Sequence, residues 1–147
     1  MLTLDELLHP ITRDRFDADY NDRKPLHIPA GEGAPKRGLL NWAGFNALLD
    51  QSSIWTAQSL KLVFNGQPIP AEQYCIETQS QSGPTVRPSP AKVQTLLAMG
   101  ASVIAGDVQE LTPELRGLSH RLARDFAGLV GANIYCSFGG VQAFDTH

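Results

Sequence analysis

The chain has 147 residues, of which 42% are hydrophobic and 18% are charged, so it is long enough to bury the core of one globular domain. Its formal net charge of −3 gives no bulk attraction to nucleic acid, and we expect no direct nucleic-acid binding. The sequence has no apolar run long enough to cross a membrane, and its N-terminus lacks the basic and apolar segments of a secretion signal. These features favour a cytoplasmic protein without a membrane span.

Two capping signals open the chain, and each predicts a short helix. Residues 3–6 have the pattern of a capping box, and apolar residues follow at helical intervals. Thr12 predicts a second N-cap, and the helix it starts has to end before Pro25 because the residue before a proline favours an extended conformation. Residues 26–28 then predict a strand, and we interpret His27 as an ordinary strand histidine.

The middle of the chain predicts a helix followed by a hairpin. Residues 42–49 carry their large apolar side chains on one stripe, which is typical of a helix that packs against a core. Residues 60–64 predict a strand and residues 65–66 a tight turn. Residues 73–78 predict an irregular return strand, because the two prolines before them weaken the pairing.

Residues 79–88 lack periodicity and are rich in polar and turn-forming residues, so we expect a mobile loop there. Such a loop either borders a substrate channel, where Arg87 would contact the substrate, or is a solvated connection between two elements. The sequence does not decide between these alternatives.

Two later helices are each predicted by a hydroxyl residue that precedes a proline, at Ser89-Pro90 and Thr112-Pro113. The first helix is expected to end at Gly100. The second is expected to run to near Gly131, because leucines recur every three or four residues along it. Arginines lie opposite these leucines, and their face either binds an acidic partner or is solvated.

The two cysteines, Cys75 and Cys136, are far apart in the sequence and have no Cys-x-x-Cys or Cys–His spacing. We therefore expect both to be reduced thiols with a structural role.

Residues 133–138 alternate between polar and apolar side chains, which predicts a strand. Asn133, Tyr135 and Ser137 would share one face, and the apolar residues between them would share the other. Two interpretations fit this pattern. The polar face either lies in water, or it lines the inside of a barrel that binds a ligand.

The order of elements, and the strand Asn133-x-Tyr135 followed by a glycine-containing loop and His147, resembles the JmjC-type oxygenases of the cupin superfamily, specifically the ribosomal-oxygenase branch. Asn133 and Tyr135 stand fourteen and twelve residues before His147, which is similar to the spacing in that family. The resemblance implies an α+β fold and one domain over residues 1–147. Residues 1–99 would be a lead-in, and residues 100–147 the first part of a double-stranded β-helix whose barrel is incomplete in this chain.

The same resemblance implies a site for Fe(II) and 2-oxoglutarate. His147 would be the first iron ligand, Tyr135 would hydrogen-bond the co-substrate's carboxylate, and Asn133 would line the same pocket. The implied reaction hydroxylates a protein or peptide side chain, and a ribosomal protein is one candidate substrate. Asp145 precedes His147 where the family's carboxylate follows the histidine, so we do not expect it to bind iron.

A facial triad needs two histidines and a carboxylate, and this chain supplies one of these ligands at the matching position. We therefore expect the 147-residue chain by itself to be inactive, as a fragment of an oxygenase. The alternative is a non-catalytic interaction module that binds a partner, or forms a homodimer, through its helices or an open sheet edge. The coding sequence beyond residue 147 discriminates between the two.

Overall fold

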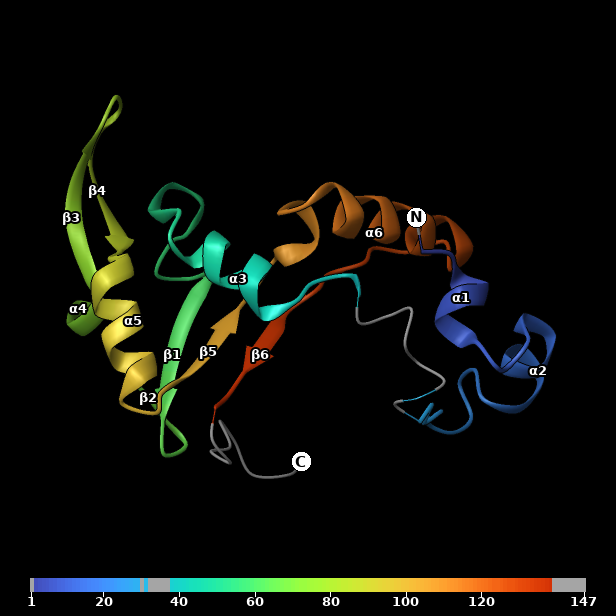
Figure 1. The fold of residues 1–147 in the computed structure, drawn as a ribbon. Helices are drawn as coiled ribbons and strands as arrows, with labels where there is room; N and C mark the ends of the chain where they lie inside the picture. The colour runs from blue at the N-terminus through green and yellow to red at the C-terminus, as the bar shows by residue number, and fades with distance from the viewer. Residues whose placement is uncertain (1, 30, 32–37, 139–147) are drawn as a thin grey trace. The chain divides into compact units, whose positions relative to one another are not determined.

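The computed structural model describes residues 2–29, 31 and 38–138. Their contacts separate into two compact units, and we describe each unit by itself. The helical unit comprises Met1–Asn41 and Gln109–Gly131, and the sheet unit comprises Trp42–Val108 and Ala132–His147. The described residues combine helices with antiparallel strands and form no closed barrel, which confirms the α+β class and leaves the double-stranded β-helix a prediction (Figure 1).

The helical unit contains α1 (Leu4–Leu8), α2 (Arg13–Asp19) and α6 (Pro113–Asp125). Each begins at a threonine whose hydroxyl accepts a hydrogen bond from the backbone N–H three residues later, at 3.2 Å for Thr3, 3.3 Å for Thr12 and 3.2 Å for Thr112. Glu6 completes the capping box by accepting from the Thr3 N–H. The three predicted helix starts are confirmed, because the hydroxyls satisfy N–H groups that have no partner inside the helix.

Helix α6 ends at Asp125, so the prediction that it runs to near Gly131 was wrong. Ala127 adopts a positive φ of 50°, and the Gly128 N–H donates to the Ala123 carbonyl. This left-handed cap ends the helix, and it leaves Leu129 fully exposed although the leucine repeat reaches it.

The predicted strand at residues 26–28 was also wrong, because these residues form no strand pairing with the rest of the described chain. Pro25 and Pro29 flank the segment, and neither can donate a backbone hydrogen bond to a neighbouring strand.

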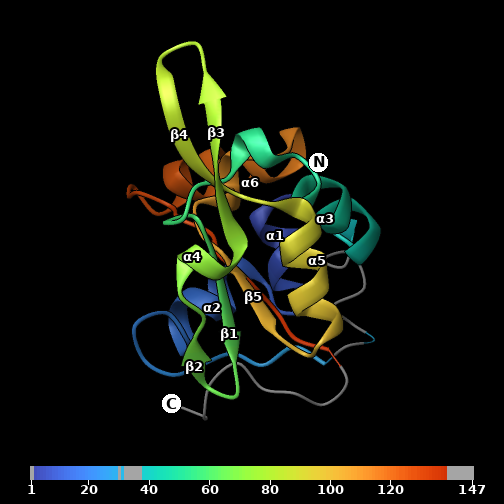
Figure 2. The same cartoon turned by 90° about the vertical axis from the view of Figure 1, so that its left-hand side faces the viewer.

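The sheet unit contains a four-stranded antiparallel sheet in the order β2-β1-β5-β6 (Figures 1 and 2). Its strands are β1 (Leu60–Phe64), β2 (Gln67–Pro68), β5 (Ser102–Ala105) and β6 (Ile134–Cys136). Asn65 and Gly66 both have positive φ, at 49° and 75°, and form the tight turn that the sequence predicted between β1 and β2.

The return strand predicted at residues 73–78 does not pair with β1. Strand β2 ends after two residues, because Pro68 and Pro70 interrupt the pairing, and the chain then turns through α4 (Ala71–Tyr74). The following residues form a separate hairpin of β3 (Cys75–Ser80) and β4 (Gly83–Pro88). The mobile loop predicted at residues 79–88 was therefore wrong.

Most of the core of the sheet unit lies on one face of the sheet, although Val63 and Ser102 are buried on the other. Helices α3 (Trp42–Leu49) and α5 (Pro90–Ala98) lie on the same side of the sheet (Figures 1 and 2). Short 3-10 helices cover Ser52–Ile54 and Val108–Glu110. The buried side chains of the sheet and of the segments around it include Phe45, Leu49, Trp55, Leu60, Leu62, Val93, Leu97, Val103 and Ala105. The opposite face of β1, β5 and β6, which we call the open face, carries Lys61, Ile104 and Tyr135.

Leu62→Ala should lower the free energy of unfolding by about 2–5 kcal/mol, because it removes a fully buried side chain from the central strand. The matched control is Lys61→Met at the neighbouring position, which is exposed and should change stability by less than about 0.5 kcal/mol. Urea unfolding followed by circular dichroism measures both. Equal losses for the two variants would contradict the assignment of the two faces.

Candidate functional site

Strand β6 shows the alternation that its sequence predicted. Asn133, Tyr135 and Ser137 are exposed, while Ile134, Cys136 and Phe138 are partly covered. Tyr135 exposes 62% of its surface. The polar face is therefore accessible in the described part of the chain.

The strand register aligns three residues in one row across the open face. Lys61 on β1 pairs with Ile104 on β5, and Ile104 pairs with Tyr135 on β6. Directly paired residues of antiparallel strands point to the same side of a sheet. A cation, an aliphatic side chain and a phenol are thus neighbours although they come from distant parts of the sequence.

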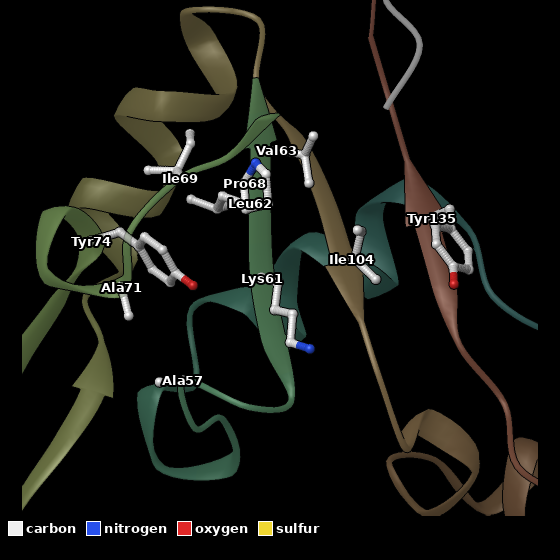
Figure 3. A pocket seen from close by; sticks show the side chains of 10 residues that line it. All are labelled: Ala57, Lys61, Leu62, Val63, Pro68, Ile69, Ala71, Tyr74, Ile104 and Tyr135. Atoms are coloured by element: carbon white, nitrogen blue, oxygen red, sulfur yellow. The ribbon is translucent and has the colours of Figure 1, made fainter. Parts of the chain in front are cut away.

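A cavity of about 430 Å³ lies over this row (Figure 3). Tyr74 stands across β1 from Tyr135, and Lys61 lies between these two rings in Figure 3. The lining is mainly apolar and comprises Ala57, Lys61, Leu62, Val63, Pro68, Ile69, Ala71, Tyr74, Ile104 and Tyr135. Its volume falls in the range of small-molecule sites, about 300–1,000 Å³.

Tyr74 forms a fixed wall of this cavity. The residue is 2% exposed, and its hydroxyl donates a hydrogen bond of 3.1 Å to the Leu60 carbonyl. Burial raises the pKa of the phenol above its ordinary value, so Tyr74 is neutral at physiological pH. Because its hydroxyl already donates to the Leu60 carbonyl, Tyr74 can contact a ligand only through its ring.

Lys61 is the cationic group of the cavity. Among the described residues, no carboxylate lies within ion-pair distance of its ammonium. Tyr135 adds a hydroxyl at the other end of the row. A lysine and a phenol beside an apolar wall are suited to an anionic group attached to an apolar body.

Asn133 precedes β6 and lies close to Gly106, where its Oδ1 is 3.5 Å from the position that a Cβ would occupy. It does not line the 430 Å³ cavity, so the structure brings only Tyr135 of the two predicted pocket residues to that cavity. Ser137 contacts β5 through a 2.6 Å hydrogen bond between the hydroxyls of Ser102 and Ser137.

His147 and Asp145 lie outside the described residues, so the role of His147 as an iron ligand stays a prediction. Within the described ranges, no group of three or more His, Cys, Asp or Glu side chains could hold a metal ion. His9 and His27 are exposed, and His27 lies in no strand, although it was predicted to be an ordinary strand histidine.

Arg87 has a structural contact, and its contact with a substrate stays a prediction. Its Nη1 donates to the carbonyls of Ser53 and Trp55, at 2.6 and 3.1 Å. These bonds fasten β4 to the 3-10 helix at Ser52–Ile54. The two cysteines are free thiols, and burial raises the pKa of both Cys75 and Cys136, as expected for structural cysteines.

The sequence analysis missed Lys61 and Tyr74. Lys61 was overlooked because the residues around it in the predicted strand are apolar. A charged residue between Leu60 and Leu62 nevertheless indicates that one face of that strand is accessible. Tyr74 was placed in a return strand, and only the observed α4 brings its ring to the open face. No helix of the described chain has the length and apolar content that a membrane crossing needs.

No known protein family's sequence profile matches the chain. The chain is similar to the bifunctional lysine-specific demethylase and histidyl-hydroxylase NO66 of Branchiostoma floridae, with 26% identity over 143 residues. The match covers 96% of this chain and 22% of the relative, so the chain spans about a fifth of that protein's length. This similarity supports a distant relationship to JmjC- and cupin-type proteins.

Tyr74→Phe should remove part of the loss of stability at alkaline pH. Burial raises the pKa of Tyr74 in the folded chain, so at alkaline pH the folded chain keeps a phenol proton that the unfolded chain has released. The free energy of unfolding therefore falls as the pH rises above 10.0. Near neutral pH the free energy of unfolding of the variant should be about 1 kcal/mol lower than that of the parent, because the hydrogen bond to the Leu60 carbonyl is lost. Between about pH 9 and 11 it should then fall less steeply than that of the parent. Urea unfolding at several pH values measures this.

The exposed Tyr135→Phe serves as the control and should keep the alkaline loss of the parent. An identical alkaline loss in Tyr74→Phe and the parent would assign the effect to the two thiols, whose pKa values are also raised.

Proposed function

We propose that this chain is the N-terminal part of the catalytic domain of an Fe(II)- and 2-oxoglutarate-dependent oxygenase of JmjC type, which hydroxylates a protein or peptide side chain. The observation that carries the proposal is the exposed polar face of β6, with Asn133 and Tyr135 fourteen and twelve residues before His147. The distant similarity to a histidyl-hydroxylase and lysine demethylase supports it and favours a protein substrate. A ribosomal protein is one candidate substrate.

The residues of the open face fit the co-substrate. A dicarboxylate needs a cation or hydroxyl donors, and Lys61 and Tyr135 supply both kinds beside the same cavity. Tyr135 would hydrogen-bond a carboxylate of the co-substrate, and Asn133, which lies outside this cavity, would contact the co-substrate from the same face of β6. When bound, iron and 2-oxoglutarate supply the oxidation of the substrate carbon by molecular oxygen.

The described residues alone do not fit the iron, because they hold no metal-binding group of three or more ligand-type side chains. His147 would contribute one ligand, and a facial triad needs a further histidine and a carboxylate. The proposal therefore requires residues beyond position 147, and it implies no turnover by the 147-residue chain alone.

A second candidate is a non-catalytic interaction module. Strand β6 stands at the edge of the sheet formed by the described residues, and the β3–β4 hairpin exposes Ile76 and Val86. Unpaired edges and exposed apolar side chains both favour association between chains. This candidate would gain support if the coding sequence stopped at residue 147 and light scattering found a stable dimer.

His147→Ala in the protein extended by its natural coding sequence should abolish iron-dependent formation of succinate from 2-oxoglutarate. The physical reason is that a facial triad with one ligand missing does not hold Fe(II) in place. The matched control is His120→Ala, which removes an exposed histidine of α6 and should leave turnover unchanged. Unchanged succinate formation in His147→Ala would remove this residue from the site.

A further inference from the structure

The hairpin of β3 and β4 is a two-stranded sheet that no other strand of the described chain extends. Its pairing runs from Cys75 and Pro88 at the base to Ser80 and Gly83 beside the turn. Figure 1 shows β3 on the far side of β4 from the four-stranded sheet, so β3 is the outer strand of the hairpin. An isolated two-stranded hairpin is marginally stable in water, and a strand added to it would stabilise it.

The prolines of β4 determine which backbone groups of β3 point outward. Pro84 pairs with Gln79, and Pro88 pairs with Cys75. A proline has no N–H, so neither pair can exchange the two hydrogen bonds of a hydrogen-bonded pair. Because the two kinds of pair alternate, Glu77 also belongs to a pair without these bonds. The N–H and C=O groups of Glu77 and Gln79 therefore point away from β4, and we call them the outer edge of β3.

A hydrogen bond at the base of the hairpin agrees with this alternation. The Ser89 N–H donates to the Tyr74 carbonyl at 2.8 Å. These two residues stand one position beyond the pair of Cys75 and Pro88, where the alternation requires a hydrogen-bonded pair.

The two edges of the hairpin differ in their protection against a further strand. The outward-pointing positions of β4 are Pro84, Val86 and Pro88, so prolines remove two of the three possible donors. Prolines on an edge strand prevent pairing with another chain. Strand β3 contains no proline, lysine or glycine, and the side chains of Glu77 and Gln79 are exposed. A further strand can therefore add to the β3 side of the hairpin and not to the β4 side.

The outer edge of β3 is complementary to a second copy of itself in one register. If two β3 strands run antiparallel with their Thr78 residues opposite each other, Glu77 of each copy lies opposite Gln79 of the other. The backbones of these two residues then exchange four hydrogen bonds across the two copies. Ile76 lies opposite Ser80, so five residues of each strand are paired.

The side chains favour this register over its neighbours. The carboxylate of Glu77 can accept a hydrogen bond from the side-chain amide of Gln79 in the other copy. A shift of two residues in one direction would place the two Glu77 carboxylates opposite each other, and like charges in directly opposite positions destabilise a sheet. A shift in the other direction would move the turn of each hairpin into the pairing and leave fewer paired residues.

We infer that the chain forms a homodimer in which the outer edges of two β3 strands pair antiparallel around Thr78, giving a four-stranded sheet in the order β4-β3-β3-β4. The pairing covers a short strand, and small interfaces are typical of weak complexes, so we expect the dimer to be in exchange with the monomer. The inference is independent of the oxygenase proposal. It deepens the second candidate function, because it names the surface through which two chains associate.

The first test measures the dissociation constant of the dimer by analytical ultracentrifugation of the 147-residue chain, at concentrations up to about 1 mM. Gln79→Pro removes an outward-pointing N–H from each copy, and with it two of the four hydrogen bonds between them. The dissociation constant should rise by about 10-fold or more. The matched control is Val86→Pro, which removes the outward-pointing N–H of β4 and should leave the dissociation constant unchanged. Circular dichroism confirms that both variants are folded.

The second test traps the register with a disulfide and leaves the backbone donors intact. Opposite residues of a pair without hydrogen bonds have their Cα atoms about 4.5 Å apart, which is within the range for a disulfide. Thr78→Cys should therefore form a covalent dimer under mild oxidation, seen by non-reducing electrophoresis. The control is Thr85→Cys, which changes the residue paired with Thr78 inside the hairpin and should stay monomeric. The parent gives the background from Cys75 and Cys136.

Three results would overturn the inference. A parent chain that stays monomeric at every concentration would exclude the dimer and leave an extended segment of another protein as the occupant of this edge. A dissociation constant that is equal in Gln79→Pro and the parent would exclude the β3 edge, and the second candidate function would then need another interface, such as β6. Equal cross-linking of Thr78→Cys and Thr85→Cys would exclude the register. None of these results bears on succinate formation, which tests the oxygenase proposal separately.

Discussion

The antiparallel register of β1, β5 and β6 is the constraint on which the rest of the sheet unit depends. It pairs Leu62 with Val103 and Cys136 on the core face, and Lys61 with Ile104 and Tyr135 on the open face. Since side chains alternate along a strand, a slip of one residue would bury Lys61 and expose Leu62. The cost of burying an unpaired ammonium excludes that slip, so one charged residue fixes both the core and the site.

The cavity needs a second wall, and an irregular connection provides it. The prolines at positions 68 and 70 end the β1–β2 pairing early, and the chain turns into α4 instead of continuing along the sheet. Tyr74 at the end of α4 then reaches back to the Leu60 carbonyl, which ties that helix to β1. A longer, regular hairpin would have added a strand and left the open face flat.

The sequence predicted local features of the chain better than it predicted which strands pair with one another. The threonine caps, the Asn65-Gly66 turn and the alternation of residues 133–138 depend on groups close in the chain, and all three were predicted correctly. The strand pairings depend on distant residues, so the return strand at 73–78 was assigned to the wrong neighbour and the hairpin at 75–88 was predicted as a loop. For the same reason Tyr135 was a predicted site residue, whereas Lys61, which only the β5 pairing brings near it, was not.

The open face separates two chemical requirements that an oxygenase site combines. Holding a metal ion needs several ligand atoms within about 2.0–2.2 Å of one point, which the described side chains do not provide. Holding a carboxylate needs a cation and a hydrogen-bond donor, and side chains of these two kinds, Lys61 on β1 and Tyr135 on β6, lie on the same face with β5 between them. An oxygenase that contained this chain would therefore have to take its iron ligands from residues outside the described ranges. Any covering of the open face by further chain would exclude water from the cavity and strengthen the attraction between Lys61 and an anion placed there.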